Sequence, residues 1–185
     1  MRNLYSILAD LLEYPGDDWA ECLERAEKLC LPGSSYGLLR EFLCDVQSTP
    51  VPLLQECYTR IFDLNPVCTL EVGYHLFGEN YKRGLFLANL SETEKSHEVA
   101  LNGQLPDYLP ALLLLLDRLP EGELRTDLIS QCMVAALEKM SQALSKSASP
   151  YAHLITVVHE LLKSDADQSQ TVSAAQAAYP SGGMP

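Results

Sequence analysis

The sequence lacks a hydrophobic run long enough to cross a membrane. Its longest apolar stretch, Leu109 to Leu116, is eight residues long and includes a proline, whereas a membrane-spanning helix needs about 20 apolar residues. The chain opens Met-Arg-Asn-Leu-Tyr-Ser, with one basic residue and Asp10 soon after, which does not fit a secretory signal. These absences predict a cytoplasmic protein that does not insert into the membrane.

Positive charge is also scarce. Thirteen Lys and Arg residues stand against 25 Asp and Glu, which gives a net charge of −12. Binding to nucleic acid phosphates requires clustered Lys and Arg, so we expect no nucleic-acid partner. Between Asp10 and Glu27 there are seven carboxylates and one basic residue, Arg25. This stretch is either a solvated helix face that keeps the protein soluble or a field that attracts a basic peptide.

The usual signatures of catalysis, nucleotide binding and metal binding are missing. The sequence has no P-loop, no Gly-x-Ser-x-Gly nucleophile elbow and no His-Glu-x-x-His motif. His153 and His159 are six residues apart, about 240° around a helix, so they cannot share a metal unaided. The six cysteines include no Cys-x-x-Cys pair, and most fall on apolar helix faces, where thiols behave as small hydrophobic groups. The chain is therefore predicted to be no enzyme, with no metal, no cofactor and no disulfides.

What the sequence does contain is a series of amphipathic helix patterns separated by proline and glycine. Apolar residues recur every three or four positions from Leu4 to Leu12, and similar stripes follow as far as Leu162. A capping residue before proline marks helix starts at 49–50, 65–66 and 149–150. No strand-like alternation appears. The prediction is an all-α, single-domain helical bundle of about eight to ten helices.

Several boundaries follow from the same signals. We expect a helix from Pro66 to Phe77, another over about 80–90, and a buried helix over about 108–119. Ser91-Glu-Thr-Glu94 fits a capping box that would begin a short turn after the helix over 80–90. From Lys163 onward the composition shifts to Ser, Ala, Gln, Asp and Gly. Residues 1–162 are therefore expected to form the domain and 163–185 a flexible, disordered tail.

One segment combines aromatic and polar residues. Between Tyr58 and Pro110, tyrosines, a histidine, an arginine and an aspartate stand among apolar residues, with glycines and prolines at the breaks. Their spacing is not that of a hydrolytic triad, a metal cage or a phosphate loop. A segment rich in aromatic residues and poor in catalytic pairs favours a surface that holds another polypeptide.

Four motifs in the chain resemble those of a known family in order and spacing. They are Leu-Ala-Asp-Leu-Leu-Glu-Tyr-Pro at 8–15, Tyr58-Thr-Arg-Ile-Phe-Asp63, Tyr74-His-Leu-Phe77 with Arg83-Gly84 after it, and Leu105-Pro-Asp-Tyr-Leu-Pro110. Over roughly residues 1–162 the chain resembles the nitrate reductase delta-type assembly chaperones, the NarJ branch of the NarJ/TorD/DmsD redox-enzyme maturation proteins. The resemblance implies a TorD-like helical fold.

The resemblance also implies a function. A protein of this kind is expected to bind the N-terminal, twin-arginine-like peptide of the apo catalytic subunit of a respiratory nitrate reductase. It would hold that subunit for molybdenum cofactor insertion before membrane attachment, without binding the cofactor itself. The peptide would enter as an amphipathic helix laid in an apolar groove. Helical bundles of this kind can exchange helices, so a homodimer is a further expectation.

The same resemblance points to a set of peptide-binding residues, namely Tyr58, Tyr74, His75, Tyr81, Arg83, Gly84, Pro106, Asp107 and Tyr108. Asp107 has two interpretations, since it can cap the following helix or pair with an arginine of the client. Many relatives carry histidine where this chain has Tyr108, and tyrosine does not titrate near neutral pH. Arg83 is either part of the binding site or an internal salt-bridge partner that fixes the loop.

Two alternatives stay open at this point. The same fold could serve another molybdoenzyme, of the dimethyl sulfoxide or selenate reductase type. The protein could also be a small-molecule binder or enzyme, which a closed pocket with Asp107 and His75 within hydrogen-bond reach of each other would favour. An open groove lined by Tyr74, Tyr81 and Tyr108 would favour the chaperone.

Overall fold

The predicted apolar stripes of the N-terminal part each fall on a helix. In the computed structural model, which describes residues 2–29, 34–64 and 68–178, these stripes supply buried side chains from Tyr5 to Phe62. The helices are α1 (Arg2–Leu11), α2 (Trp19–Leu29), α3 (Ser34–Gln47), α4 (Val51–Tyr58) and the π-helical turn η1 (Thr59–Asp63).

The remaining described residues form a second series of helices. These are α5 (Val72–Phe77), α6 (Tyr81–Ser96), α7 (Leu109–Arg118), α8 (Glu123–Asp127), the π-helical turn η2 (Leu128–Met133), α9 (Val134–Leu144) and α10 (Pro150–Ala178). Helix α8, η2 and α9 follow one another without a break, so the long helix predicted around Ile129 to Leu144 begins earlier, at Glu123. The prediction of an all-α, single-domain bundle is confirmed for the described part of the chain.

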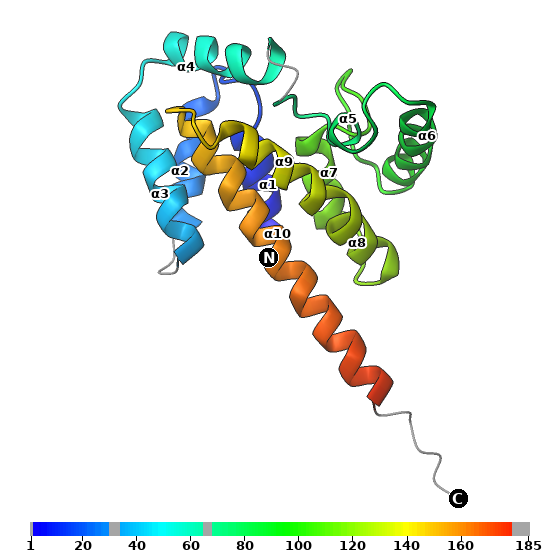
Figure 1. Ribbon diagram of the computed structural model, residues 1–185. Helices are drawn as coiled ribbons and strands as arrows, with labels where there is room; N and C mark the ends of the chain where they lie inside the picture. The colour runs from blue at the N-terminus through cyan, green and yellow to red at the C-terminus, as the bar shows by residue number, and fades with distance from the viewer. Residues whose placement is uncertain (1, 30–33, 65–67, 179–185) are drawn as a thin grey trace, which may run out of the picture.

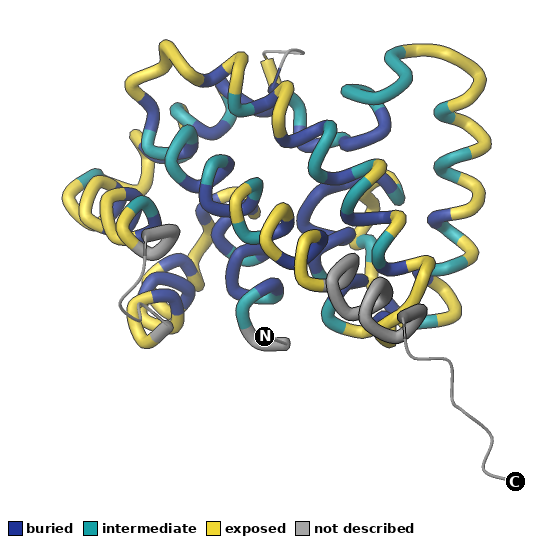
Figure 2. The backbone as a smooth tube through the Cα atoms, turned by 60° about the horizontal axis from the view of Figure 1, so that its bottom comes forward, coloured by how far each residue is buried: buried dark blue, intermediate teal, exposed yellow. Residues whose placement is uncertain are grey.

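The core lies where the central helices meet. Helix α1 packs against α7 and α2, and α10 packs against α3 and α9 (Figure 1). Leu109, Leu112 and Leu113 of α7 are fully buried, which accounts for the run of leucines in that helix because a helix surrounded by others needs no polar face. Figure 2 shows buried residues gathered on these central helices, while the outer helices alternate between buried and exposed positions.

Helices α5 and α6 lie to one side of this core. Helix α6 packs mainly against α5, and its first residue, Tyr81, is 75% exposed. The pair is joined to the rest of the bundle by packing of α5 against α9 and by an isolated antiparallel bridge between Glu71 and Tyr108. In this bridge the Val72 amide donates to the Asp107 carbonyl at 2.8 Å, and the Leu109 amide donates to the Leu70 carbonyl at 2.8 Å.

This bridge explains why the predicted helix over 66–77 is too long. The helix begins only at Val72, because Glu71 before it is extended and bridges to Tyr108, and the Leu70 carbonyl pairs with the segment that leads into α7. Backbone groups that find partners across the bridge do not need helical ones. The start signal at Asn65-Pro66 lies outside the described residues.

The predicted capping box at Ser91–Glu94 is wrong. Helix α6 runs through these residues to Ser96, and no proline or glycine interrupts it after Gly84. Glu94 is inside the helix, 1% exposed, and neither of its carboxylate oxygens has a hydrogen-bond partner. Burial of this carboxyl group, with the negative charge of Asp107 nearby, raises the pKa of Glu94 to about 7.

We expect the stability of the protein to depend on the charge of Glu94. The folded protein holds this proton more tightly than the unfolded chain, so Glu94 makes stability fall as the pH rises from about 4.5 to about 7. Glu94→Gln removes the charge and keeps the shape. The variant should be more stable than wild type by about 1–2 kcal/mol at pH 8 and nearly equal to it at pH 5, as measured by urea unfolding. A difference that is the same at both pH values would contradict this account.

Helix α10 continues past the predicted domain boundary at residue 162. It extends to Ala178, and Asp165 and Ala166 are buried. Asp165 accepts hydrogen bonds from Tyr5 and Arg125, so the first residues of the predicted tail pack onto the bundle. Residues 179–185 lie outside the described part, and a flexible tail there stays a prediction.

The cysteines in the described residues, Cys22, Cys44, Cys57, Cys68 and Cys132, are free. Cys30 lies outside the described residues. Among the residues described, no helix is both long enough and apolar enough for a membrane crossing.

Candidate functional site

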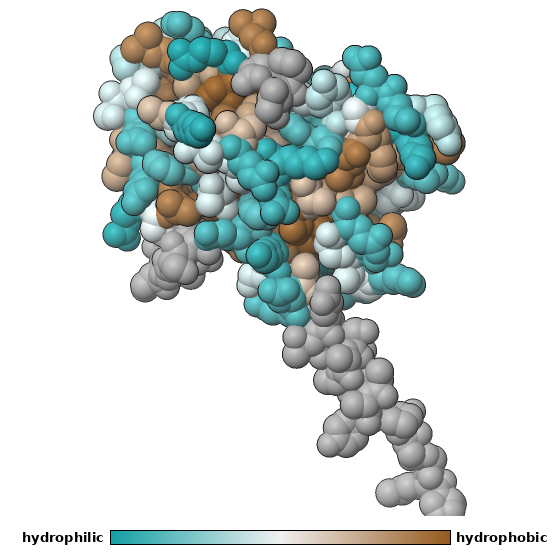
Figure 3. Space-filling model, in the orientation of Figure 1, coloured by the Kyte–Doolittle hydropathy of each residue, from teal (hydrophilic) through white to brown (hydrophobic). Residues whose placement is uncertain are grey.

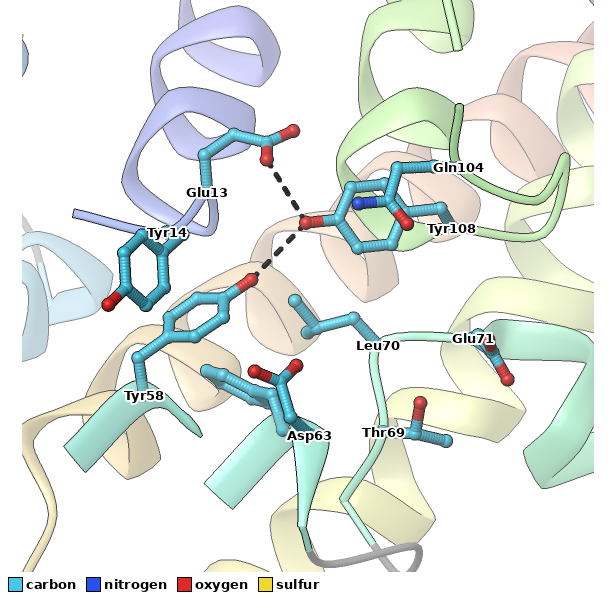
Figure 4. Close-up of a pocket in the computed structure, with 10 residues that line it drawn as sticks. Glu13, Tyr14, Tyr58, Asp63, Thr69, Leu70, Glu71, Gln104 and Tyr108 are labelled. Atoms are coloured by element: carbon cyan, nitrogen blue, oxygen red, sulfur yellow. Dashed lines mark hydrogen bonds between the residues drawn. The ribbon is translucent and has the colours of Figure 1, made fainter. Parts of the chain in front are cut away.

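A pocket of about 320 Å³ opens beside Tyr58 and Tyr108 (Figure 4). Its lining comes from four separate parts of the chain: the end of α1, the α4–η1 turn, the extended segment before α5, and the segment before α7. The lining residues are Glu13, Tyr14, Tyr58, Phe62, Asp63, Thr69, Leu70, Glu71, Gln104 and Tyr108.

Two tyrosine hydroxyls meet at the pocket. The Tyr108 hydroxyl donates to Glu13 Oε2 at 3.1 Å, the Tyr58 hydroxyl donates to the Leu12 carbonyl at 3.0 Å, and the two hydroxyls are 3.2 Å apart. Burial raises the pKa of both phenols, so both stay protonated. The two hydroxyl groups make three contacts but have only two protons, so one of the three contacts has no hydrogen between its two oxygens at any moment. The pair can therefore accept a hydrogen bond from a donor that enters the pocket.

Aromatic rings form the floor of the pocket. The rings of Tyr14 and Tyr58 meet edge to face with centroids 5.5 Å apart, and those of Tyr58 and Phe62 with centroids 4.9 Å apart. Tyr151 of α10 packs behind both Tyr58 and Phe62. Tyr14 is half exposed, so the aromatic surface continues from the core to solvent. Such a surface offers apolar contact and attraction for a cation.

The charged groups of the pocket lining are all acidic. They are Glu13, Asp63 and Glu71, and no lysine or arginine of the described residues lines the pocket. Burial raises the pKa of Glu13, and the hydrogen bond from Tyr108 opposes that shift. Carboxylates beside aromatic rings form an environment that suits an ammonium or guanidinium group better than an anion.

Behind Glu71 lies a cluster of ion pairs, here called the Arg83 cluster and made of Glu71, Arg83 and Asp107. Arg83 Nε is 2.9 Å from Asp107 Oδ2, and Arg83 Nη2 is 2.9 Å from Glu71 Oε2. Burial alone would lower the pKa of Arg83, but the two carboxylates outweigh it and hold that pKa above its usual value. The Arg83 guanidinium also lies 5.8 Å above the centre of the Tyr74 ring.

Asp107 caps a helix, but not the predicted one. The N-cap of α7 is Tyr108, which makes no side-chain capping bond. Asp107 Oδ2 instead accepts from the Gly73 amide at 3.1 Å, in the first turn of α5. A Cβ atom at Gly73 would lie 2.6 Å from that oxygen, so the close approach requires glycine. Asp107 is 0% exposed, which does not favour the interpretation in which its carboxylate pairs with an arginine of the client.

The sequence of this chain is similar to those of known proteins. No family model matches the chain. A protein of Escherichia coli (strain K12) named nitrate reductase molybdenum cofactor assembly chaperone NarJ is 29% identical over 170 residues, which cover 89% of this chain and 71% of that protein. The chain is similar to these assembly chaperones.

Two further relatives are similar to most of this chain. The probable nitrate reductase molybdenum cofactor assembly chaperone NarJ of Bacillus subtilis (strain 168) is 28% identical over 94% of this chain and 95% of its own length. A nitrate reductase-like protein NarX of Mycobacterium tuberculosis (strain ATCC 25618 / H37Rv) is 30% identical over 80% of this chain, but over only 22% of its own length. The predicted resemblance is confirmed, and relatives named as chaperones agree with the prediction that this protein is not an enzyme.

The predicted site residues fall into three groups in this fold. Tyr58 and Tyr108 line the pocket. Arg83, Asp107 and Tyr74 lie together in or against the Arg83 cluster, so the internal salt-bridge interpretation of Arg83 is confirmed. The other four predicted residues are not among those that line the pocket; they are His75, Tyr81, Gly84 and Pro106.

The acidic residues of the pocket were not singled out from the sequence. Glu13 and Asp63 stand inside two of the motifs that carry the family resemblance, Leu-Leu-Glu-Tyr-Pro and Tyr-Thr-Arg-Ile-Phe-Asp. Acidic residues are so frequent in this chain that no single carboxylate stands out. Only the fold brings Glu13, Asp63 and Glu71 to one pocket.

The features expected of a small-molecule enzyme are not met. His75 Nε2 is 2.7 Å from the Thr69 carbonyl, and the Asp107 carboxylate is taken by Gly73 and Arg83, so these two side chains do not pair with each other. Burial lowers the pKa of His75, which keeps the ring neutral. Among the described residues, no group of three or more His, Cys, Asp or Glu side chains is arranged to hold a metal ion.

Proposed function

We propose that the protein is a system-specific chaperone for the catalytic subunit of a respiratory nitrate reductase. It binds the N-terminal segment of the apo subunit and holds it for molybdenum cofactor insertion before membrane attachment. The observation that carries this proposal is the similarity to named assembly chaperones over most of the chain. The pocket beside Tyr58 and Tyr108 supplies the site.

The chemistry of the pocket fits a basic peptide. A lysine or arginine side chain of the client would place its charge among Glu13, Asp63 and Glu71 and its methylene groups against the aromatic floor. The donor groups of such a side chain would also complete the hydroxyl contacts of Tyr58 and Tyr108. Binding of this kind involves no covalent step.

The charge on the protein's surface is suited to attract and then release such a client. On the face in Figure 3, hydrophilic residues predominate and hydrophobic ones form separate patches instead of one continuous apolar groove. Helix α2 adds exposed carboxylates at Glu21, Glu24 and Glu27. A net negative charge raises the rate of association with a basic peptide more than the final affinity. Ordering a flexible peptide consumes a few kcal/mol, so we expect moderate affinity and ready release.

Isothermal titration calorimetry tests this function. The ligand is a synthetic peptide of about the first 30 residues of the nitrate reductase catalytic subunit from the same organism, a length that an amphipathic helix with flanks requires. We expect a micromolar dissociation constant, on the order of 1–10 μM. A scrambled peptide of equal charge should bind at least about tenfold more weakly, because charge alone does not place an arginine in the pocket.

Three controls define the other outcomes. Equal binding of the native and scrambled peptides would mean that the acidic surface attracts basic peptides without specificity. It would contradict the proposal of a specific client. Binding of the corresponding peptide from a dimethyl sulfoxide or selenate reductase, with none from nitrate reductase, would assign another molybdoenzyme as client. No binding of any of these peptides would reject the peptide-capture role.

A further inference from the structure

The Arg83 cluster has one member in the pocket and one in the interior. Glu71 lines the pocket and its side chain is 34% exposed, whereas the Asp107 side chain is fully buried. Arg83 stands between them and is not among the residues that line the pocket. We propose that Asp107 and Arg83 are positioning residues that hold Glu71 and Tyr108 in place for the client, and that neither touches the client itself. This inference rests on the proposed function.

Asp107 is connected to both sides of the pocket. Its side chain accepts from the Gly73 amide and from Arg83, and its carbonyl accepts from the Val72 amide. These bonds fix the segment that carries Glu71. Tyr108 follows Asp107 directly in the chain. Its hydroxyl donates to Glu13 and lies 3.2 Å from the Tyr58 hydroxyl, on the opposite side of the pocket. A displacement of Asp107 therefore moves two parts of the pocket lining at once.

The two carboxylates of the cluster differ in the free energy that is needed to separate each of them from Arg83. Asp107 has no access to water, so losing Arg83 would leave a buried charge without a partner, which is strongly unfavourable. Glu71 is partly exposed, so water can replace Arg83 as a partner of its carboxylate at a smaller cost. When a cation of the client enters the pocket, Glu71 can turn toward it while Arg83 stays with Asp107.

A positioning role and a contact role give opposite expectations for Arg83. If Asp107 bound the client cation, Arg83 would compete with the client, and removing Arg83 would strengthen binding. If Arg83 and Asp107 only position the pocket lining, removing either one should weaken binding. Removing both should cost no more than removing one, because the two residues act as a unit.

The experiment uses the full chain and the nitrate reductase peptide described above. Calorimetry compares wild type with Arg83→Gln, Asp107→Asn and the double variant. We expect each of the three variants to bind about tenfold more weakly than wild type, without additivity in the double variant. Tighter binding by Arg83→Gln would overturn the inference. Lys82→Gln is the matched control, because Lys82 is exposed on the same helix and the substitution changes the net charge equally; it should bind within about twofold of wild type.

The double variant distinguishes a loss of binding caused only by unfolding from one caused by a displaced pocket lining. It leaves no unpaired buried charge, so its thermal midpoint should recover toward wild type, while its affinity should not. Recovery of both would assign a merely structural role and overturn the proposal. Failure of the wild-type protein to bind the peptide would instead reject the proposed function.

A second measurement identifies which carboxylate meets the client. Each arginine of the peptide is replaced in turn by citrulline, which has the same shape without the charge. In a double-mutant cycle, one of these replacements should lose most of its effect on the dissociation constant when the protein is Glu71→Gln. Glu71 is partly exposed, so this substitution does not put folding at risk. None should lose its effect selectively in Asp107→Asn. Coupling of a peptide arginine to Asp107 and not to Glu71 would show direct contact and contradict the positioning role.

Discussion

Asp165→Ala is expected to destabilise the protein by about 3–5 kcal/mol, because it removes the buried carboxylate that pairs with a buried arginine. Asp165 Oδ2 is 2.6 Å from Arg125 Nη2, and the two side chains are 9% and 6% exposed. The Tyr5 hydroxyl donates to the same oxygen, and the Arg125 guanidinium lies 5.5 Å above the Tyr5 ring. One carboxylate thus joins α10 to both α1 and α8.

Urea unfolding of two variants in the full chain tests this expectation. Asp165→Ala leaves the buried Arg125 with the exposed Glu121, 3.5 Å away, as its ion-pair partner. Asp165→Ala with Arg125→Met removes both buried charges and fills the space with an apolar side chain. The double variant should recover a large part of the lost stability, since replacing a buried ion pair with apolar residues is often close to neutral. Equal losses in the two variants would mean that the ion pair itself is not the cause.

We expect the same ion pair to decide where the folded domain ends. A chain that stops at residue 162 loses Asp165 and should be destabilised about as much as Asp165→Ala, whereas a chain that stops at residue 168 keeps the pair and should lose less than about 1 kcal/mol. If both truncated chains were as stable as the full chain, the sequence-based boundary at 162 would be correct after all.

This boundary shows where sequence patterns stop being informative. The stripes of α1, α7 and α10 as far as Leu162 repeat an apolar residue every three or four positions, and such periodicity predicts a buried helix face. Asp165 and Ala166 continue the buried face of α10 with residue types that also abound in disordered segments. The partners of Asp165 are Tyr5 and Arg125, far away in the sequence, and no local pattern reveals such a pairing.

The candidate site could be predicted from the sequence only in part, because its residues too come from segments that are far apart in the chain. The motifs around Tyr58 and Tyr108 marked two parts of the pocket lining, but the carboxylates that give the pocket its charge come from three separate segments. For Asp107, the local pattern predicted a cap on the helix that follows it, and this prediction is wrong. It could not show that the capped helix is α5, because the amide of Gly73 is 34 residues away and reaches Asp107 only in the fold.

Gly73→Ala is expected to destabilise the protein by about 2–4 kcal/mol, because overpacking would also disturb a buried ion pair. The added Cβ would lie 2.6 Å from Asp107 Oδ2, 3.0 Å from Phe86 Cδ1 and 3.3 Å from Arg83 Cγ. Asp107 cannot move away from it without weakening its bonds to Arg83 and to the Gly73 amide. The gain of about 1 kcal/mol that alanine usually brings over glycine inside a helix is too small to offset this.

Gly84→Ala is the matched control, since Gly84 stands next to Arg83 in α6 but nothing lies within 4 Å of its added Cβ. That variant should be more stable than wild type by about 0.4–1 kcal/mol, because alanine restricts the unfolded chain more than glycine does. Urea unfolding should therefore give shifts of opposite sign for the same substitution at two glycines close to Arg83. Shifts of the same sign would show that the space around Gly73 is not as tight as the close contact with Asp107 requires.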